Sequence, residues 1–598
     1  MEYTVYKATK FIDMIDYDVV IDVDMDFFPI HEIYVTQYRA MFVVNCEVKE
    51  KTMRLHKAAR NEERRGKGER ECWSNCFTGN EDQYSAAVTF NVTGNLKALI
   101  DILPKKSQID SERKPQFPPG ISISPATWLL KYSSFHGPLP LVKRLRSKLG
   151  PIFTIYVGSR PTIWISDAFL AHEALIKNGS MSADRLKAPP TNSIFNSNQH
   201  SVSSAAYGPT WQALRRNLAS HFLSPTHISS FAGVRKWALD ILIHRLEDRS
   251  KSGDPIQLRD HLLHSIFRLQ CAMCFGLFLD EAEVKEVQSI SRRILLGLPH
   301  FSILNAWPKL TKIIFATKWA EIHTLRKKLD DVFVRLIKTR KKLVESEKEK
   351  IRHCYVDSLL ELQIPNEEGG LRNLTAGEMV SLCNEFINAS TDLPSTDLEW
   401  AMANLVKYPQ IQAQLLREIK EVVGSRPNTD EIRDEDLAQI PYLKAVILEV
   451  LRRHPSGHLL LPHRIEQDME LGGYTIPKDS WIKVLVAEIG WDPNVWEDPM
   501  KFNPERFLTN DALVDKNFDL AGRKEIKMMP FGVGRRMCPG HVLTRLNLEY
   551  FVANLVWRFE WKAGEQDVDL SEETVFTIMM KNPLEALVSS RSTQDLVD

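Results

Sequence analysis

The stretch that decides the fold of this 598-residue chain is Phe531-Gly-Val-Gly-Arg-Arg-Met-Cys-Pro-Gly540. It places one cysteine, Cys538, in a glycine-rich loop before an apolar run that predicts a long helix from about His541. Gly534 and Gly540 permit sharp backbone turns that a residue with a Cβ resists. The helix that follows directs its positive end at the sulfur, which favours thiolate over thiol. Cys538 is therefore a candidate metal ligand.

The loop matches the spacing Phe-x-x-Gly-x-Arg-x-Cys-x-Gly at Phe531, Gly534, Arg536, Cys538 and Gly540. This pattern resembles the cysteine-ligand loop of the cytochromes P450, which are haem-thiolate monooxygenases. The match is specific, because multi-position motifs rarely recur by chance. The resemblance implies that Cys538 binds the iron of haem b. The alternative is a buried structural cysteine in a glycine-rich turn.

Composition argues for an ordinary globular protein and against nucleic-acid binding. Lys and Arg number 77 and Asp and Glu number 77, so the net charge is +0 and no bulk attraction to a phosphate backbone exists. The 8 cysteines are scattered and form no disulfide pattern. Cys271 and Cys274 have zinc or redox spacing, but they lie in the apolar helical run 266–279, which predicts buried core thiols. Because no window reaches about 18 consecutive apolar residues, we expect no transmembrane helix.

The chain divides near Phe117-Pro-Pro-Gly120, where proline and glycine mark a boundary. Residues 1–115 form an atypical N-terminal extension with no recognised domain, and residues 116–598 are assigned by the resemblance to a P450 haem-binding domain. We expect this domain to be mainly α with a small β region. Predicted strands cover 153–157, 162–166, 470–474 and 481–485, and the last two are expected to pair. Predicted helices cover 227–248, 376–407, 409–423 and 440–453, with loops at 279–283 and 365–373. The helix at 376–407 starts with Thr375-Ala-Gly-Glu378, a capping-box pattern.

Glu449-Val-Leu-Arg452 puts an acid and a base on one helical face, where they can pair. Taken alone this spacing is weak, because it arises by chance in any charged helix. Together with Arg506 it is similar to the Glu-Arg-Arg cluster of the P450 family. The implied role is structural, because buried charges must be paired and this triad would hold the region that carries Cys538.

Trp211-Gln-Ala-Leu-Arg215 places two side chains on one helix face, so both can reach the same ligand group. The segment resembles the P450 helix that binds a haem propionate. By the same resemblance Arg536 is a second propionate partner and His463 a third, with Arg464 as the substitute if the register differs by one residue.

The expected oxygen-activating helix departs from the family pattern at Ala389-Ser-Thr-Asp-Leu-Pro394. Asp392 keeps the acidic position and is the candidate catalytic residue. Ser390 replaces a glycine, and Leu393 replaces the threonine whose hydroxyl helps deliver protons, although leucine cannot donate a hydrogen bond. Pro394 lacks an N–H and costs about 3 kcal/mol in a regular helix. The sequence thus predicts impaired proton delivery and leakage of reducing equivalents to peroxide.

The resemblance is greatest to plant microsomal enzymes of the eighty-nine-A type. It implies oxygen insertion into a small apolar substrate, with electrons from NADPH through a partner reductase. Two other classes stay open: a haem-thiolate isomerase or dehydratase that acts on peroxides, and a catalytically impaired haem-binding copy. Segments 459–461 and 195–205 are expected to line the pocket, and an acidic reductase would dock on basic residues, namely Arg216, Arg523, Lys524 and Lys527.

The same family implies an endoplasmic reticulum membrane location, although no N-terminal anchor is visible in this sequence. The apolar segment Leu295-Leu-Gly-Leu-Pro-His-Phe-Ser-Ile-Leu304 is a candidate for peripheral membrane contact. A core or channel segment is an equal alternative for it. We expect a monomer.

Overall fold

The computed structural model describes residues 117–132, 137–346, 353–366, 368–424, 431–509 and 518–591. The expected extension 1–115 lies outside these residues. The helices are α5 (Pro125–Tyr132), α6 (Leu139–Leu149), α7 (Ala168–His172), α8 (Pro190–Phe195), α9 (Pro209–Arg216), α10 (Pro225–Ser230), α11 (Ala232–Ser250), α12 (Leu258–Phe275), α13 (Glu281–Phe301), α14 (Pro308–Ile314), α15 (Ala316–Ser346), α16 (Tyr355–Glu361), α17 (Ala376–Lys407), α18 (Pro409–Val423), α19 (Pro441–Arg453), α20 (Val486–Gly490) and α21 (His541–Arg558).

The strands are β1 (Gly120–Ile123), β2 (Ile152–Val157), β3 (Arg160–Ile165), β4 (Ile256–Gln257), β5 (Gln363–Pro365), β6 (Leu371–Asn373), β7 (His463–Arg464), β8 (Met469–Leu471), β9 (Tyr474–Ile476), β10 (Trp481–Val484), β11 (Phe559–Ala563), β12 (Glu572–Thr574), β13 (Ile578–Met580) and β14 (Glu585–Ser590). The largest sheet has the order β1-β2-β3-β10-β7, in which β3 and β10 run parallel and β2 and β3 form a hairpin. The mainly helical fold with a small β region is therefore confirmed.

The β2–β3 hairpin agrees with its prediction because its side chains alternate between two cores. Trp164 packs in the apolar cluster that contains α6, whereas Ile163 and Ile165 pack in the cluster on the other sheet face. A strand buried on both faces has to be apolar at successive positions. Gly158, at φ +65°, makes the turn between the two strands.

Three predicted boundaries are wrong. The strand expected at 470–474 is instead the hairpin β8–β9, because Gly472 and Gly473 adopt positive φ and reverse the chain. Its expected partner β10 pairs with β3 and β7 instead. The helix expected at 227–248 is interrupted at the buried Phe231, and the loop expected at 279–283 contains the start of α13 behind the N-cap Asp280.

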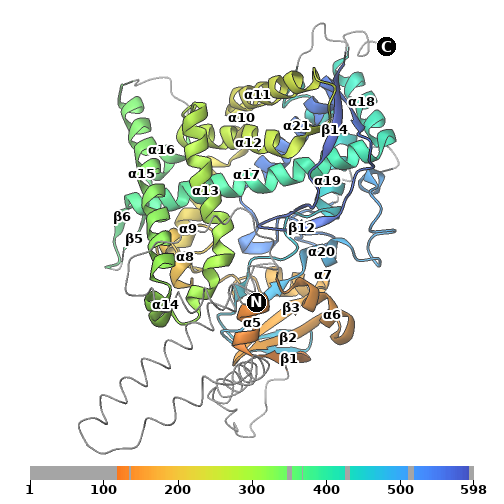
Figure 1. Ribbon diagram of the computed structural model, residues 1–598. Coiled ribbons are helices and arrows are strands. Elements are labelled where there is room, and N and C mark those ends of the chain that lie inside the picture. Colours follow the sequence, from red (N-terminus) through yellow and green to blue (C-terminus); the bar gives the residue numbers. More distant parts are fainter. Residues whose placement is uncertain are drawn as a thin grey trace, which may run out of the picture. The chain divides into compact units, whose positions relative to one another are not determined.

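The long helix α17 has the predicted bounds and crosses the helical region, with α12, α19 and α21 packed against it (Figure 1). The predicted capping box is present, since the Thr375 hydroxyl accepts from the backbone N–H of Glu378 and the Glu378 carboxylate accepts from the Thr375 N–H. α18 also has its predicted bounds, and α19 begins one residue late. The predicted loop 365–373 is partly wrong, because its last three residues form strand β6, which pairs with β5 as a hairpin.

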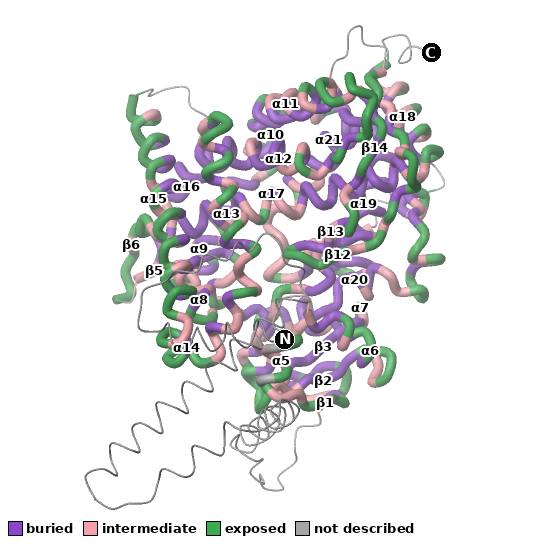
Figure 2. The backbone as a smooth tube through the Cα atoms, viewed as in Figure 1, coloured by how far each residue is buried: buried purple, intermediate pink, exposed green. Residues whose placement is uncertain are grey.

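Most of α17 is buried, but its middle carries an accessible stripe (Figure 2), which consists of Glu385, Asn388, Ala389, Ser390, Asp392 and Leu393. Residues four and seven apart on a helix share one face, so this stripe is a single face of α17. Ala389 is exposed in the middle of a core helix. Accessible space therefore lies beside α17 at the residues expected to activate oxygen.

Cys271 and Cys274 are buried on α12, as predicted. Burial raises the pKa of both thiols, which makes them unreactive core groups. Among the described residues, no helix combines the length and apolar composition needed to cross a bilayer.

Candidate functional site

The loop before Cys538 is a tight backbone structure. The Cys538 N–H donates to the Phe531 carbonyl at 2.8 Å, and the Met537 N–H donates to the Gly534 carbonyl at 3.1 Å. Gly534 has φ +72°, and a Cβ on it would lie 2.2 Å from the carbonyl oxygen of Leu175. Only glycine fits there, both by conformation and by space.

The expectation for Gly540 is wrong. Its φ is −88°, which any residue adopts, and a Cβ on it would meet only the Cys538 sulfur, at 3.9 Å. The second glycine with left-handed geometry in the loop is Gly532, at φ +65°. Gly540 contributes through its backbone N–H, which donates to the sulfur.

The helix α21 begins at His541 as predicted, yet the pKa of the Cys538 thiol is not lowered by the protein's own groups. Burial raises its pKa, and the Gly540 N–H and the charge of Arg215 only partly oppose this. The desolvation of a thiolate therefore outweighs the helix end. A bound metal cation supplies the missing positive charge, because it replaces the proton on its thiolate ligand.

Three arginines gather beside this thiol from distant parts of the chain. Arg215 comes from α9, Arg536 from the cysteine loop and Arg185 from the segment before α8. Burial lowers the pKa of all three arginines, and repulsion from a neighbouring arginine adds to this for Arg185, to about 9, and for Arg536, to about 10, while nearby acidic groups oppose the shift. A desolvated group of cations with too few acids is a binding site for an anion.

Trp211 and Arg536 brace this group. The Arg536 guanidinium lies 4.3 Å from the centre of the Trp211 ring. Arg536 donates to the carbonyls of Ala183 and Ala205, both at 2.7 Å, and the Trp211 N–H donates to the carbonyl of Val202 at 3.1 Å. Trp211 and Arg536, which are both predicted to bind a propionate, are thus adjacent, and backbone carbonyls orient both side chains.

His463 and Arg464 are neighbours in strand β7, so their side chains point to opposite faces of the sheet. Arg464 pairs with Asp184 at 2.6 Å and with Asp479 at 2.9 Å, so acids already neutralise it. His463 is buried on the other face of β7, with Nδ1 2.6 Å from the carbonyl oxygen of Ser182 and Nε2 without a hydrogen-bond partner among the described residues. Burial, with help from Arg185 and Arg536, lowers the His463 pKa to about 3.

Arg185 was not predicted from the sequence. It donates to the carbonyls of Ser203, Leu461 and Pro462. No local sequence pattern surrounds Arg185, so its place in the site is recognised only from its electrostatic coupling to Arg536 in the folded protein. Glu385 on the accessible stripe of α17 was missed for the same reason, although its carboxylate accepts the N–H groups of residues 202 and 203 at 2.8 Å.

These residues fit a haem. A haem needs a soft axial ligand, positive charge for two carboxylates and a flat space between. Cys538 offers the sulfur, and the arginines with the unpartnered Nε2 of His463 offer the charge and a polar contact. The accessible stripe of α17 adjoins this group, because Glu385 accepts the Val202 N–H and Arg536 donates to the Val202 carbonyl.

On the α17 side, Asp392 lies 3.0 Å from Arg292 of α13. Burial raises the Asp392 pKa and Arg292 partly opposes this. Ser390 turns back and donates to the carbonyl of Phe386 at 2.6 Å, so its hydroxyl is engaged within the helix. Pro394 lies inside α17 without ending it.

The structure also brings Glu449, Arg452 and Arg506 together. Arg452 donates to both carboxylate oxygens of Glu449, and Arg506 donates to one of them at 3.1 Å. The Asn503 N–H is a further donor to Glu449, at 2.8 Å. The carboxylate is thus saturated inside the protein.

Comparison with known proteins matches these observations. The cytochrome P450 family model matches residues 118–588, and a model of the EAPP beta-tent domain matches residues 28–92. The chain is 46% identical to cytochrome P450 89A9 of Arabidopsis thaliana over 486 residues, which cover 80% of this chain and 93% of that protein. It is 29% identical to iridoid oxidase of Catharanthus roseus, over 84% of this chain and 97% of that protein.

A solved zebra fish cytochrome P450 structure with progesterone is similar in three dimensions, with a TM-score of 0.64 and 25% identity over 76% of this chain and 99% of the other. The family carries haem b and receives electrons from NADPH through a reductase. The chain therefore belongs to the cytochrome P450 family, as a plant-type haem-thiolate monooxygenase that acts on small organic substrates.

Proposed function

We propose that Cys538 is the axial ligand of the haem and that Arg215, Arg536, His463 and Trp211 hold its propionates. The observation that carries this proposal is the group of half-buried arginines that couples to the Cys538 thiol through Arg215, and whose charge the neighbouring acids do not balance. Arg185 joins this set by its charge coupling to Arg536. Phe531, Gly534 and Gly540 position the sulfur through the loop backbone.

When bound, the haem supplies the centre at which oxygen is reduced and one of its atoms is inserted into the substrate. Asp392 is the proposed distal acid, and its pairing with Arg292 holds it at the accessible stripe. Glu449, Arg452 and Arg506 have a structural role, since their hydrogen bonds join α19 to the segment 503–506. Residues 116–598 form the haem-binding domain, and residues 1–115 precede it.

The substrate is a small apolar molecule. Leu461 is exposed and Val202 contacts the arginine group through its carbonyl, which supports the expected pocket segments at both places. Leu459, in contrast, is buried in the sheet core with Trp164, so it supports that core.

Peripheral membrane contact fits α14 better than the segment 295–304. In that segment Leu295, Phe301 and Leu304 are buried. The neighbouring α14 region exposes Trp307, Leu310 and Ile313, the last at 79%, and Lys309 and Lys312 alternate with them along the chain. Exposed apolar residues flanked by lysines suit a lipid interface. We propose a monomer bound at the endoplasmic reticulum membrane through this region.

The reductase is proposed to dock on the basic residues of the cysteine-loop side. Arg216, Arg523 and Lys524 are exposed, and Lys527 forms an ion pair with Glu525 at 3.3 Å. Exposed cations increase the rate of encounter with an acidic partner.

The test is the carbon-monoxide difference spectrum of the reduced full-length protein beside Cys538→Ser. We expect the thiolate band in the first and its loss in the second. Retention of that band in Cys538→Ser would refute the ligand assignment. Turnover of a lipid hydroperoxide without NADPH would instead favour an isomerase or dehydratase, which the leucine at position 393 makes a relevant second candidate.

A further inference from the structure

The middle of α17 contains a short repeat. Ser390-Thr-Asp-Leu393 recurs as Ser395-Thr-Asp-Leu398, with Pro394 between the copies. A shift of five residues turns a helix by roughly 140° beyond one full turn, so the two copies face different neighbours. Asp392 meets Arg292, whereas the described structure gives Asp397 no cationic partner and one carboxyl oxygen without a hydrogen bond. The second copy thus places an acid, Asp397, and a hydroxyl, Thr396, in an environment that differs from that of the first copy.

Two pairs of side chains from three parts of the chain lie there. The Thr396 hydroxyl donates to the carbonyl of Asp392 at 2.8 Å and lies 3.1 Å from the hydroxyl of Thr577. The Asp397 carboxyl is hydrogen-bonded to the Ser456 side chain. The two pairs are linked through the backbone, because the N–H of Ile578, the residue after Thr577, donates to the Ser456 carbonyl at 2.9 Å.

We propose that this hydroxyl–carboxyl cluster, Thr396, Asp397, Ser456 and Thr577, holds and delivers protons for the monooxygenase reaction in place of the hydroxyl missing at Leu393. The proposal rests on the monooxygenase function given above. Thr396 lies one helical turn after Asp392, at the end of the accessible stripe, so the cluster adjoins the open side of α17. The impaired proton delivery expected from Leu393 is thereby offset.

The order of donors within the cluster follows from the hydrogen bonds. The Thr396 proton points to the Asp392 carbonyl, so the Thr577 hydroxyl is the donor between the two threonines. Burial raises the pKa of Asp397 to about 8, opposed only by Ser456, so this acid carries a proton at neutral pH. A neutral buried carboxyl is a hydrogen-bond donor as well as a proton reserve.

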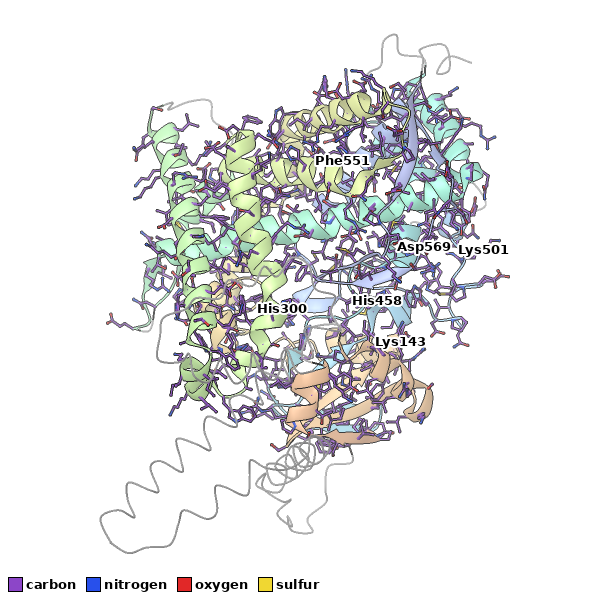
Figure 3. All side chains as sticks on the ribbon, viewed as in Figure 1. Lys143, His300, His458, Lys501, Phe551 and Asp569 are labelled. Carbon is purple, nitrogen blue, oxygen red and sulfur yellow. The ribbon has the colours of Figure 1, made fainter. Side chains whose placement is uncertain are left out.

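Each turnover consumes two protons when one oxygen atom enters the substrate and the other leaves as water, so the cluster has to be recharged from solvent. The turn that carries Ser456 also carries His454 and His458, and both face Glu572, at 3.9 and 3.4 Å. Glu572 is the solvent-accessible member of this group, and His458 is marked in Figure 3. His454 also stacks on Trp400, one turn after Asp397 on α17. Protons re-enter the cluster from this group, whose two histidines lie on the same turn as Ser456.

The experiment uses the full-length, haem-loaded protein with NADPH and reductase, and measures peroxide formed per NADPH consumed across pH. We expect Asp397→Asn and Thr396→Val to raise this ratio roughly threefold or more, and Asp397→Asn to remove the wild-type pH dependence near the acid's titration. Thr396→Ser, which keeps the hydroxyl, restores the wild-type ratio. Ser395→Ala is the matched control, because Ser395 is a buried neighbouring hydroxyl with no hydrogen-bond partner among the described residues.

A second readout does not depend on turnover. The infrared carbonyl band of a protonated carboxyl should be present at neutral pH in the wild type and in Thr396→Val, and absent in Asp397→Asn. Unchanged peroxide ratios in Asp397→Asn and Thr396→Val, or an equal rise in Ser395→Ala, would overturn the proposal. The carbon-monoxide spectrum of each variant distinguishes failure of the proton-delivery proposal from failure of the proposed function. A missing thiolate band would contradict only haem ligation by Cys538.

Discussion

Arg452 donates two hydrogen bonds to the carboxylate of Glu449, at 2.7 and 2.8 Å, and both side chains are fully excluded from solvent. Arg452 also donates to the carbonyl of Gly490 at 2.9 Å, so the pair joins α19 to α20. Two charges removed from water are tolerated only while each keeps its partner.

Glu449→Gln should therefore destabilise the protein by about 3–5 kcal/mol, because it leaves the buried Arg452 charge uncompensated. The denaturant midpoint and haem content measure this effect. Asp248→Asn is the matched control, since it breaks the exposed ion pair with Lys251, at 2.8 Å, and should leave stability nearly unchanged. Equal effects of the two substitutions would contradict a structural role for Glu449.

Gly534→Ala and Gly540→Ala should differ sharply. At Gly534 the new Cβ would collide with the Leu175 carbonyl oxygen at 2.2 Å in a backbone of positive φ, whereas at Gly540 the nearest atom is 3.9 Å away. We expect Gly534→Ala to lose bound haem and Gly540→Ala to keep most of it, as measured by the haem absorbance per protein. Normal haem content in Gly534→Ala would show that the loop can shift.

Arg215→Gln should weaken haem retention about tenfold or more, because one charge-assisted contact is worth roughly 1.5–3 kcal/mol. The neighbouring Arg216→Gln is its control, since Arg216 is exposed at the end of α9 and Arg215 is half-buried and coupled to Cys538. Transfer of haem to apomyoglobin gives the dissociation rate of each variant. The assignment fails if both variants release haem at the wild-type rate.

Asp397 should make folding stability fall as pH rises. Its folded-state pKa is about 8 and its ordinary value is 3.8, so between these values the unfolded chain has lost a proton that the folded protein keeps. Each pH unit in this window then costs about 1.4 kcal/mol of folding free energy. Asp397→Asn should remove this slope in urea unfolding between pH 5 and 8, and an unchanged slope would mean that Asp397 ionises normally.

The sequence alone determined the parts of this protein that depend on local pattern. The residue spacing around Cys538 identified the protein family. Apolar periodicity and the capping box at Thr375 predicted both ends of α17 correctly. Such features need only neighbours a few residues away, so they can be read along the chain. Where a local signal was overlooked, as at Gly472 and Gly473, the predicted strand was wrong.

Tertiary structure decided which side chains meet. Arg185 and Arg215 lie far along the chain from His463 and Arg536, and the shared effect of the four on charge exists only after folding removes them from water. The same holds for Asp397 beside Ser456, where burial turns an ordinary acid into a neutral donor. Desolvation and long-range pairing depend on the packed interior, so the sequence fixes the candidate ligands of the cofactor and the fold decides their charge, orientation and partners.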